Sequence, residues 1–138
     1  MSALAARLEH VGLPGPLLPA WFAGVLRDGV ALTLAGGHAS FAAVARDGLR
    51  TLAARAGLAA DGEEAAEYVL GGPPELPLHP DVPDGVRALR AARYRLVTLT
   101  NGSAATTRAV LDRVGLTDCF EAHLDVEGVG RWKPAREA

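Results

Sequence analysis

A chain of 138 residues, of which 49% are hydrophobic and 22% charged, has the composition of one globular domain with a sizeable core. A formal net charge of −2 and arginines scattered along the chain argue against nucleic acid or an anionic membrane surface as a partner. The single cysteine, Cys119, excludes a disulfide framework and a multi-cysteine metal site.

The sequence pattern shows no sign of export or membrane insertion. The N-terminus lacks a charged segment followed by an apolar run and a small-residue cleavage site, which is the pattern of secretion signals. No apolar run approaches the roughly 18 residues that a membrane span needs. By elimination, we expect a cytoplasmic protein without a membrane partner.

Residues 1–72 predict a helical sub-domain. Apolar residues recur at helical spacing over residues 17–34, and Ser40 is placed as the N-cap of the next helix. Asp61 and Glu64 have the spacing of a capping box that opens a further helix. No stretch in this half shows the alternation of a strand. Five prolines then lie within residues 73–83, which predict a stiff hinge between two sub-domains.

The second half, residues 84–138, predicts alternating helices and strands. The apolar, β-branched run at 94–100 is typical of a strand, and 101–103 turns sharply into a helix that Gly115 closes. Residues 120–126 predict a second strand. This order implies parallel strands joined by a crossover helix. Two strands leave both flanks of a sheet unpaired, so we expect the chain to be incomplete as a fold.

Candidate site residues follow both predicted strands. Parallel α/β sheets bind ligands in the crevice beyond the carboxyl ends of their strands. Thr100 ends the first strand, and the loop at 101–103 leads to a helix whose free N–H groups suit a phosphate or carboxylate. Lys133 follows the second strand and is the only lysine beside thirteen arginines. Its compact ammonium offers what a planar guanidinium cannot, so we expect it in the same crevice.

These motifs carry a family resemblance. The segment LVTLTNGSAATTRAVLDRVGLTDCFEAHLDVEGVGRWKP resembles the second and third motifs of the haloacid dehalogenase superfamily, in its type II haloacid dehalogenase-like branch. The resemblance implies an α/β fold in which a partial doubly wound, Rossmann-like core carries a helical cap sub-domain. It further implies catalytic roles for Thr100 and Lys133, and contact with a small anionic substrate for Asn101 and Gly102.

The family's chemistry explains these roles. An aspartate attacks the substrate and forms a covalent ester or acyl-phosphate, which water then hydrolyses. A lysine ammonium offsets the repulsion between that carboxylate and the anionic substrate, while a hydroxyl and backbone N–H groups hold the substrate oxygens. The parent activity implied is hydrolysis of a 2-haloacid or a phosphate ester.

Two of the family's motifs have no match in the chain. MSALAARLEHVGL resembles the segment after the nucleophile signature, and the chain ends before the family's later acidic pair. We therefore expect no hydrolase activity from this polypeptide. No metal ligands or cofactor are predicted in it, and Mg²⁺ is implied only for a longer, phosphatase-type parent. The alternative is a non-catalytic binding or dimerisation module, which leaves a homodimer open.

The predicted cap departs from the true 2-haloacid dehalogenases. Their cap carries an arginine directly after a tryptophan, whereas Phe22 follows Trp21 here. Arg27 is five residues further along the same helix, about 140° around its axis. Trp21 and Phe22 either line a substrate pocket under the cap or pack in its core. This departure leaves dehalogenase and phosphatase chemistry equally open.

Overall fold

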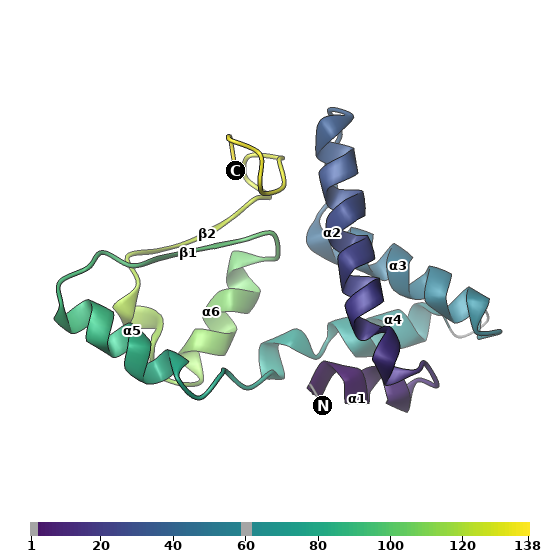
Figure 1. Cartoon of the computed structure of the whole chain (residues 1–138), viewed down its shortest axis with the longest axis horizontal. Helices are drawn as coiled ribbons and strands as arrows, with labels where there is room; N and C mark the ends of the chain where they lie inside the picture. Colours follow the sequence, from purple (N-terminus) through teal and green to yellow (C-terminus); the bar gives the residue numbers. More distant parts are fainter. Residues whose placement is uncertain (1–2, 59–61) are drawn as a thin grey trace.

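The computed structural model describes residues 3–58 and 62–138 and divides into two halves (Figure 1). The helical half (residues 3–58 and 62–72) contains α1 (Ala3–His10), α2 (Leu18–Leu34), α3 (Phe41–Arg55) and α4 (Gly62–Leu70). The α/β half (residues 82–125) contains α5 (Val82–Ala91), β1 (Val97–Thr100), α6 (Ala104–Asp112) and β2 (Ala122–Asp125).

Two helices of the first half agree with the sequence pattern: α2 covers the predicted run at 17–34, and α3 begins directly after Ser40. Ser40 caps α3, because its Oγ accepts a hydrogen bond from the N–H of Ala43 at 3.2 Å. Gly36 follows α2 with a φ of +78°, a conformation that glycine adopts without strain. No strand occurs among the described residues of this half. The capping-box prediction at Asp61 lies outside the described residues.

The core of the molecule lies mainly in the helical half. Buried residues of α1, α2, α3 and α4 pack together, and two residues that follow β2 join them from the far end of the chain. The largest fully buried side chains are Trp132, Leu8, Leu13, Leu49, Leu116, Val25, Val69 and Val126. The C-terminal segment (residues 126–138) therefore connects the two halves, and Figure 1 shows it beyond the end of β2, beside α2.

The proline-rich connection is held by Arg113, the residue directly after α6. Residues Pro73–Glu75 form a 3-10 turn, and the Arg113 guanidinium donates to the carbonyls of Pro74 and Leu76 at 2.8 and 2.7 Å. The connection ends earlier than the predicted boundary at residue 83, because Pro83 lies in the first turn of α5. Proline is tolerated there, since the first N–H groups of a helix have no intrahelical acceptor.

The two strands are parallel, and they are shorter than the runs at 94–100 and 120–126 predict. Val97 pairs with Ala122 and Thr100 with Asp125 at the two ends of the ladder. The pairing begins only at Val97 because the chain leaves α5 through Arg93, whose φ is +64°, and must first become extended. Within the described part of the chain the sheet has two strands. One of its faces is open to solvent: Val97, Leu99 and Leu124 are 53, 40 and 47% exposed.

One helical stretch contradicts the expectation that no apolar run approaches the length of a membrane span. Gly15–Leu34 has 20 residues and contains an 18-residue window with a mean hydropathy of 1.3, so by length and composition it could cross a membrane. The stretch reaches this value although Arg27 and Asp28 interrupt it, because most of its other residues are apolar. Trp21, Val25 and Gly29 of this stretch are buried within the protein. One such helix is weak evidence for a membrane span, because the core helix of a globular protein meets the same criterion.

Candidate active site

A cavity of about 430 Å³ lies where the two halves meet, and we call it the motif pocket. It is lined by residues of α2, α3 and the end of α4 on one side of the sequence, and by residues of the end of β1, the loop after it, the start of α6 and the C-terminal segment on the other. Its lining residues are Phe22, Leu26, Phe41, Ala42, Leu70, Pro73, Thr100, Asn101, Gly102, Ser103, Thr106, Thr107, Glu127 and Lys133. Thr100 and Lys133, 33 positions apart in the sequence, thus share one cavity beyond the carboxyl end of the strands.

Thr100 and Asn101 are held by hydrogen bonds that leave donors for a ligand. The Oγ1 of Thr100 accepts from the N–H of Gly102 at 2.9 Å, so its own O–H proton is still available. The Oδ1 of Asn101 accepts from the backbone N–H of Lys133 at 2.8 Å, which leaves the amide NH₂ as a donor. The loop therefore presents a hydroxyl and an amide group to the pocket.

Lys133 reaches back over the end of β1. Its Nζ donates to the carbonyl oxygen of Leu99 at 2.8 Å. An ammonium has three N–H donors, so this bond fixes the side chain and leaves two donors for an anion. Lys133 is thus tied to β1 through its side chain and to the loop after β1 through its backbone.

The start of α6 differs from the prediction of free N–H groups. The N–H of Ala104 donates to Oδ2 of Asp125 at 2.9 Å, and that of Ala105 donates to Oγ of Ser103 at 3.1 Å. Protein acceptors therefore occupy these two donors, which the sequence predicts to be free. Three hydroxyl-bearing residues that the sequence analysis did not select also line the pocket: Ser103, Thr106 and Thr107.

The opposite wall of the motif pocket is apolar and belongs to the helical half. Phe22 and Leu26 come from α2, and Phe41 comes from the first position of α3. The rings of Phe22 and Phe41 lie 6.1 Å apart in a tilted contact. The sequence analysis selected Phe22 but missed Phe41, whose position directly after the N-cap Ser40 was its only signal. A polar wall and an apolar wall therefore face each other across the pocket.

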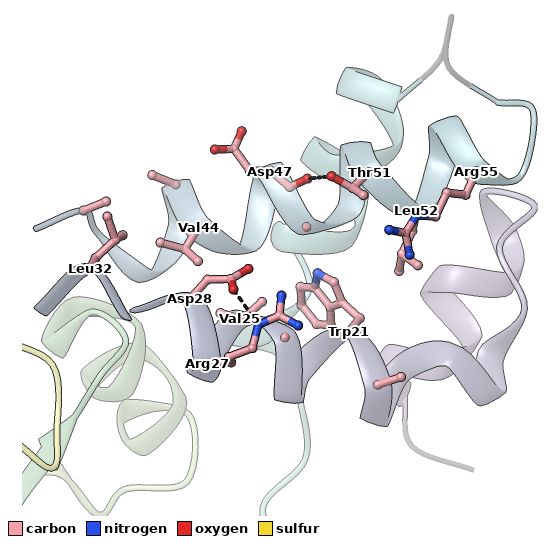
Figure 2. Close-up of a pocket in the computed structure, with 15 residues that line it drawn as sticks. Trp21, Val25, Arg27, Asp28, Leu32, Val44, Asp47, Thr51, Leu52 and Arg55 are labelled. Carbon is pink, nitrogen blue, oxygen red and sulfur yellow. Dashed lines mark hydrogen bonds and ion pairs between the residues drawn. The ribbon is translucent and has the colours of Figure 1, made fainter. Parts of the chain in front are cut away.

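Trp21 is not among the residues that line the motif pocket. It is 5% exposed, its Nε1 donates to the carbonyl of Ala45 at 3.2 Å, and it borders a second cavity of about 670 Å³. This interhelical groove lies between α2 and α3, as Figure 2 shows, and its labelled residues are Trp21, Val25, Arg27, Asp28, Leu32, Val44, Asp47, Thr51, Leu52 and Arg55.

Arg27 also borders the interhelical groove and not the motif pocket. Its Nε donates to Oδ1 of Asp28 at 2.7 Å (Figure 2). That hydrogen bond raises the pKa of Arg27 and lowers the pKa of Asp28. Arg27 therefore does not supply the motif pocket with a second cation. Among the described residues that line this pocket, Lys133 is the only cation and Glu127 the only carboxylate.

The donors around the pocket do not fit a metal ion by themselves. Both carboxylate oxygens of Asp125 accept backbone N–H groups, from Ala104 at 2.9 Å and from Glu127 at 3.2 Å. Among residues 3–58 and 62–138, no three His, Cys, Asp or Glu side chains gather in a way that could hold a metal. Mg²⁺ prefers several oxygen ligands with near-octahedral geometry, and one carboxylate does not supply them.

Comparison with protein families identifies the fold. The sequence model of the family described as haloacid dehalogenase-like hydrolase matches residues 16–138. The chain belongs to this hydrolase family. The predicted fold class, an α/β fold with a Rossmann-like core and a helical cap, is thereby confirmed. None of the curated proteins compared with the chain matches it.

Solved structures of haloacid dehalogenases resemble this chain. The L-2-haloacid dehalogenase RSc1362 is 25% identical, with a TM-score of 0.84 over 98% of this chain and 62% of that one. The L-2-haloacid dehalogenase from Xanthobacter autotrophicus is 24% identical, with a TM-score of 0.79 over 98% of this chain and 55% of that one. The structure of the same enzyme with covalently bound chloropropionic acid is 21% identical, with a TM-score of 0.76 over 99% of this chain and 57% of that one. The chain thus spans 55–62% of the length of these solved structures.

Proposed function

We propose that this chain holds the anionic group of a small substrate in haloacid dehalogenase-like hydrolysis, with Lys133 and Thr100 as the residues that contact the anion. The observation that carries the proposal is their convergence on the motif pocket, with two free ammonium donors and one hydroxyl proton. Asn101 and Gly102 border the same anion position. An ammonium and a hydroxyl directed at developing negative charge are a recurrent means of stabilising such reactions.

The apolar wall restricts the substrate further. Phe22, Leu26 and Phe41 suit an apolar body attached to the anionic head. Because Arg27 faces another cavity, the described part of the pocket neutralises one anionic group and not two. Both a 2-haloacid and a phosphate ester with a small apolar group meet this description, and both stay candidates for the parent activity.

The proposed reaction needs a carboxylate nucleophile next to this anion site. In the family's chemistry, an aspartate oxygen bonds to carbon as halide leaves, or to phosphorus as the alcohol leaves, and water then cleaves the ester or acyl-phosphate. Glu127 is the only carboxylate among the described lining residues, and the sequence analysis found no motif for a nucleophile. We therefore expect the purified 138-residue polypeptide to bind anions without turning over p-nitrophenyl phosphate or 2-chloropropionate.

Anion affinity tests the proposal directly. We expect Lys133→Met to weaken binding of inorganic phosphate about 10–100-fold in calorimetric titrations, because a charge-assisted hydrogen bond contributes about 1.5–3 kcal/mol. Arg27→Met is the matched control, since it removes the same charge from the interhelical groove. Affinities that fall equally in the two variants would indicate loss of general electrostatic attraction and would refute a specific role for Lys133.

One observation favours the second candidate, a binding or dimerisation module. The sheet face with Val97, Leu99 and Leu124 is exposed, and exposed apolar faces on a sheet are sites of association. This face lies on β1 and β2, whereas the motif pocket lies beyond the ends of the strands. The module and the anion site therefore use different surfaces, and experiments can separate them.

A further inference from the structure

Trp132 packs against the helical half at the position directly before Lys133, whose hydrogen bonds reach the α/β half. Its side chain is 0% exposed, and its ring lies against the backbone of α2 at Gly29, where a Cβ atom would overlap it. We propose that Trp132 is a positioning residue that sets the place of the Lys133 ammonium relative to the helical half. The inference rests on the proposed function of Lys133 as an anion-binding residue.

Hydrogen bonds fix Trp132 to the helical half at two points. The indole Nε1 donates to the carbonyl of Ala39 at 2.9 Å, in the loop between α2 and α3. The backbone N–H of Trp132 donates to Oγ1 of Thr33, near the end of α2, at 3.0 Å. These two hydrogen bonds fix the orientation of the indole ring and the position of the Trp132 backbone relative to the helical half.

Lys133, the next residue, is fixed to the α/β half. Its backbone N–H donates to the side chain of Asn101 and its Nζ to the carbonyl of Leu99, each at 2.8 Å. The peptide unit between residues 132 and 133 therefore joins the two halves at the edge of the motif pocket. A shift of Trp132 on α2 has to move the backbone of Lys133 or break its contacts with the loop after β1.

The apolar wall of the motif pocket also packs on Trp132. The ring of Phe41, which lines the motif pocket, stacks on that of Trp132 with centroids 5.8 Å apart and planes inclined by 26°. The apolar wall and the cation consequently share one buried support. Small displacements of groups that hold a substrate have large effects on affinity and rate, which gives this support functional weight.

Trp21 supplies a matched control for a test of this role. Both tryptophans are buried in the same core, and both indole N–H groups donate to a backbone carbonyl, that of Ala45 for Trp21. Trp21→Phe and Trp132→Phe therefore remove the same atoms and the same type of hydrogen bond. Only Trp132 adjoins Lys133, whereas Trp21 borders the interhelical groove.

The single lysine makes the measurement specific to one residue. Protein labelled with ¹⁵N-lysine gives one backbone amide signal, that of Lys133, whose shift and exchange rate report on the bond to Asn101. We expect both Trp→Phe variants to lower the melting temperature. Only Trp132→Phe should weaken phosphate binding, by about tenfold, and speed exchange of the Lys133 amide. Thr33→Val, a milder change, should act in the same direction on both readouts.

Three outcomes are distinguishable. The first outcome is that Trp132→Phe folds, binds phosphate as tightly as Trp21→Phe does and leaves the Lys133 amide unchanged, although Lys133→Met loses affinity. This outcome overturns the positioning role and leaves the proposed function standing. Unaltered phosphate affinity in Lys133→Met overturns the proposed function itself. If Trp132→Phe does not fold, the Thr33→Val variant tests the positioning role. The inference is contradicted if this variant has the phosphate affinity and the Lys133 amide exchange rate of the unsubstituted protein.

Discussion

Lys133 combines a fixed position with unused hydrogen-bonding capacity. One N–H of its ammonium bonds the carbonyl of Leu99, which leaves two donors, and Lys133 lines a pocket whose other polar residues carry hydroxyls, an amide and one carboxylate. A guanidinium at this place would spread its five donors in one plane over a broader group than the compact ammonium. A chain with thirteen arginines and one lysine therefore has its lysine where a compact cation is useful.

Gly29 is the residue on which the ring of Trp132 rests. We expect Gly29→Ala to destabilise the protein by about 1–3 kcal/mol, because the added methyl group overlaps a buried ring that has no room to move. Thermal or denaturant unfolding of the variant and of the unsubstituted protein measures this difference in the free energy of unfolding.

Gly24→Ala on the same helix is the control, since the nearest atom to its Cβ would be Arg27 Nη2 at 4.0 Å. It should stabilise the protein by about 0.5–1 kcal/mol through helix propensity alone. Two glycine substitutions with effects of equal sign would contradict the close packing of Trp132 on α2.

At the scale of elements, the loop between β1 and α6 depends on caps from two directions. Ser103 caps the helix from within the loop, and Asp125 reaches it from the end of the neighbouring strand. The parallel register brings Asp125 beside Thr100, so that one carboxylate orders the loop that holds the site. The pairing of β1 with β2 therefore places the carboxylate that holds the start of α6, next to the loop after β1.

Two serine caps allow structural and functional effects to be separated. Ser103→Ala and Ser40→Ala should each cost about 1 kcal/mol of stability, because each removes one N-cap acceptor. Only Ser103 lines the motif pocket, so only Ser103→Ala should also weaken phosphate binding, by about 3–10-fold. Calorimetric titration of both variants at one pH is the measurement, and equal affinities would remove Ser103 from the site.

At the scale of the whole molecule, the exposed sheet face is the feature that distinguishes the two candidate functions. If the face with Val97, Leu99 and Leu124 mediates association, light scattering should show a dimer at micromolar concentration that Leu124→Lys dissociates. Val129→Lys, at another exposed apolar residue outside the strands, is the control and should leave the mass unchanged. A monomer in both cases leaves the dimerisation module without support.

The sequence allowed the polar half of the site to be anticipated, but not its apolar half. Thr100 and Lys133 each follow a predicted strand, and the carboxyl ends of parallel strands converge by geometry. Phe41 and Leu26 reach the pocket only through the packing of α2 and α3 on the C-terminal segment, which helical periodicity does not specify. The occupied N–H groups of α6 were missed for a similar reason, because their acceptor Asp125 belongs to another element.

The two walls of the motif pocket come from separate stretches of chain, and this has a consequence for engineering. Side chains at 22 and 26 on α2 can be varied in size without replacing any residue that we propose binds the anion, and of the two only Phe22 contacts the ring of Phe41. Libraries restricted to these two positions would retune which organic group is accepted, while the charged end of the ligand stays recognised as before. Position 41 is less independent, because its ring also supports the tryptophan beside the lysine.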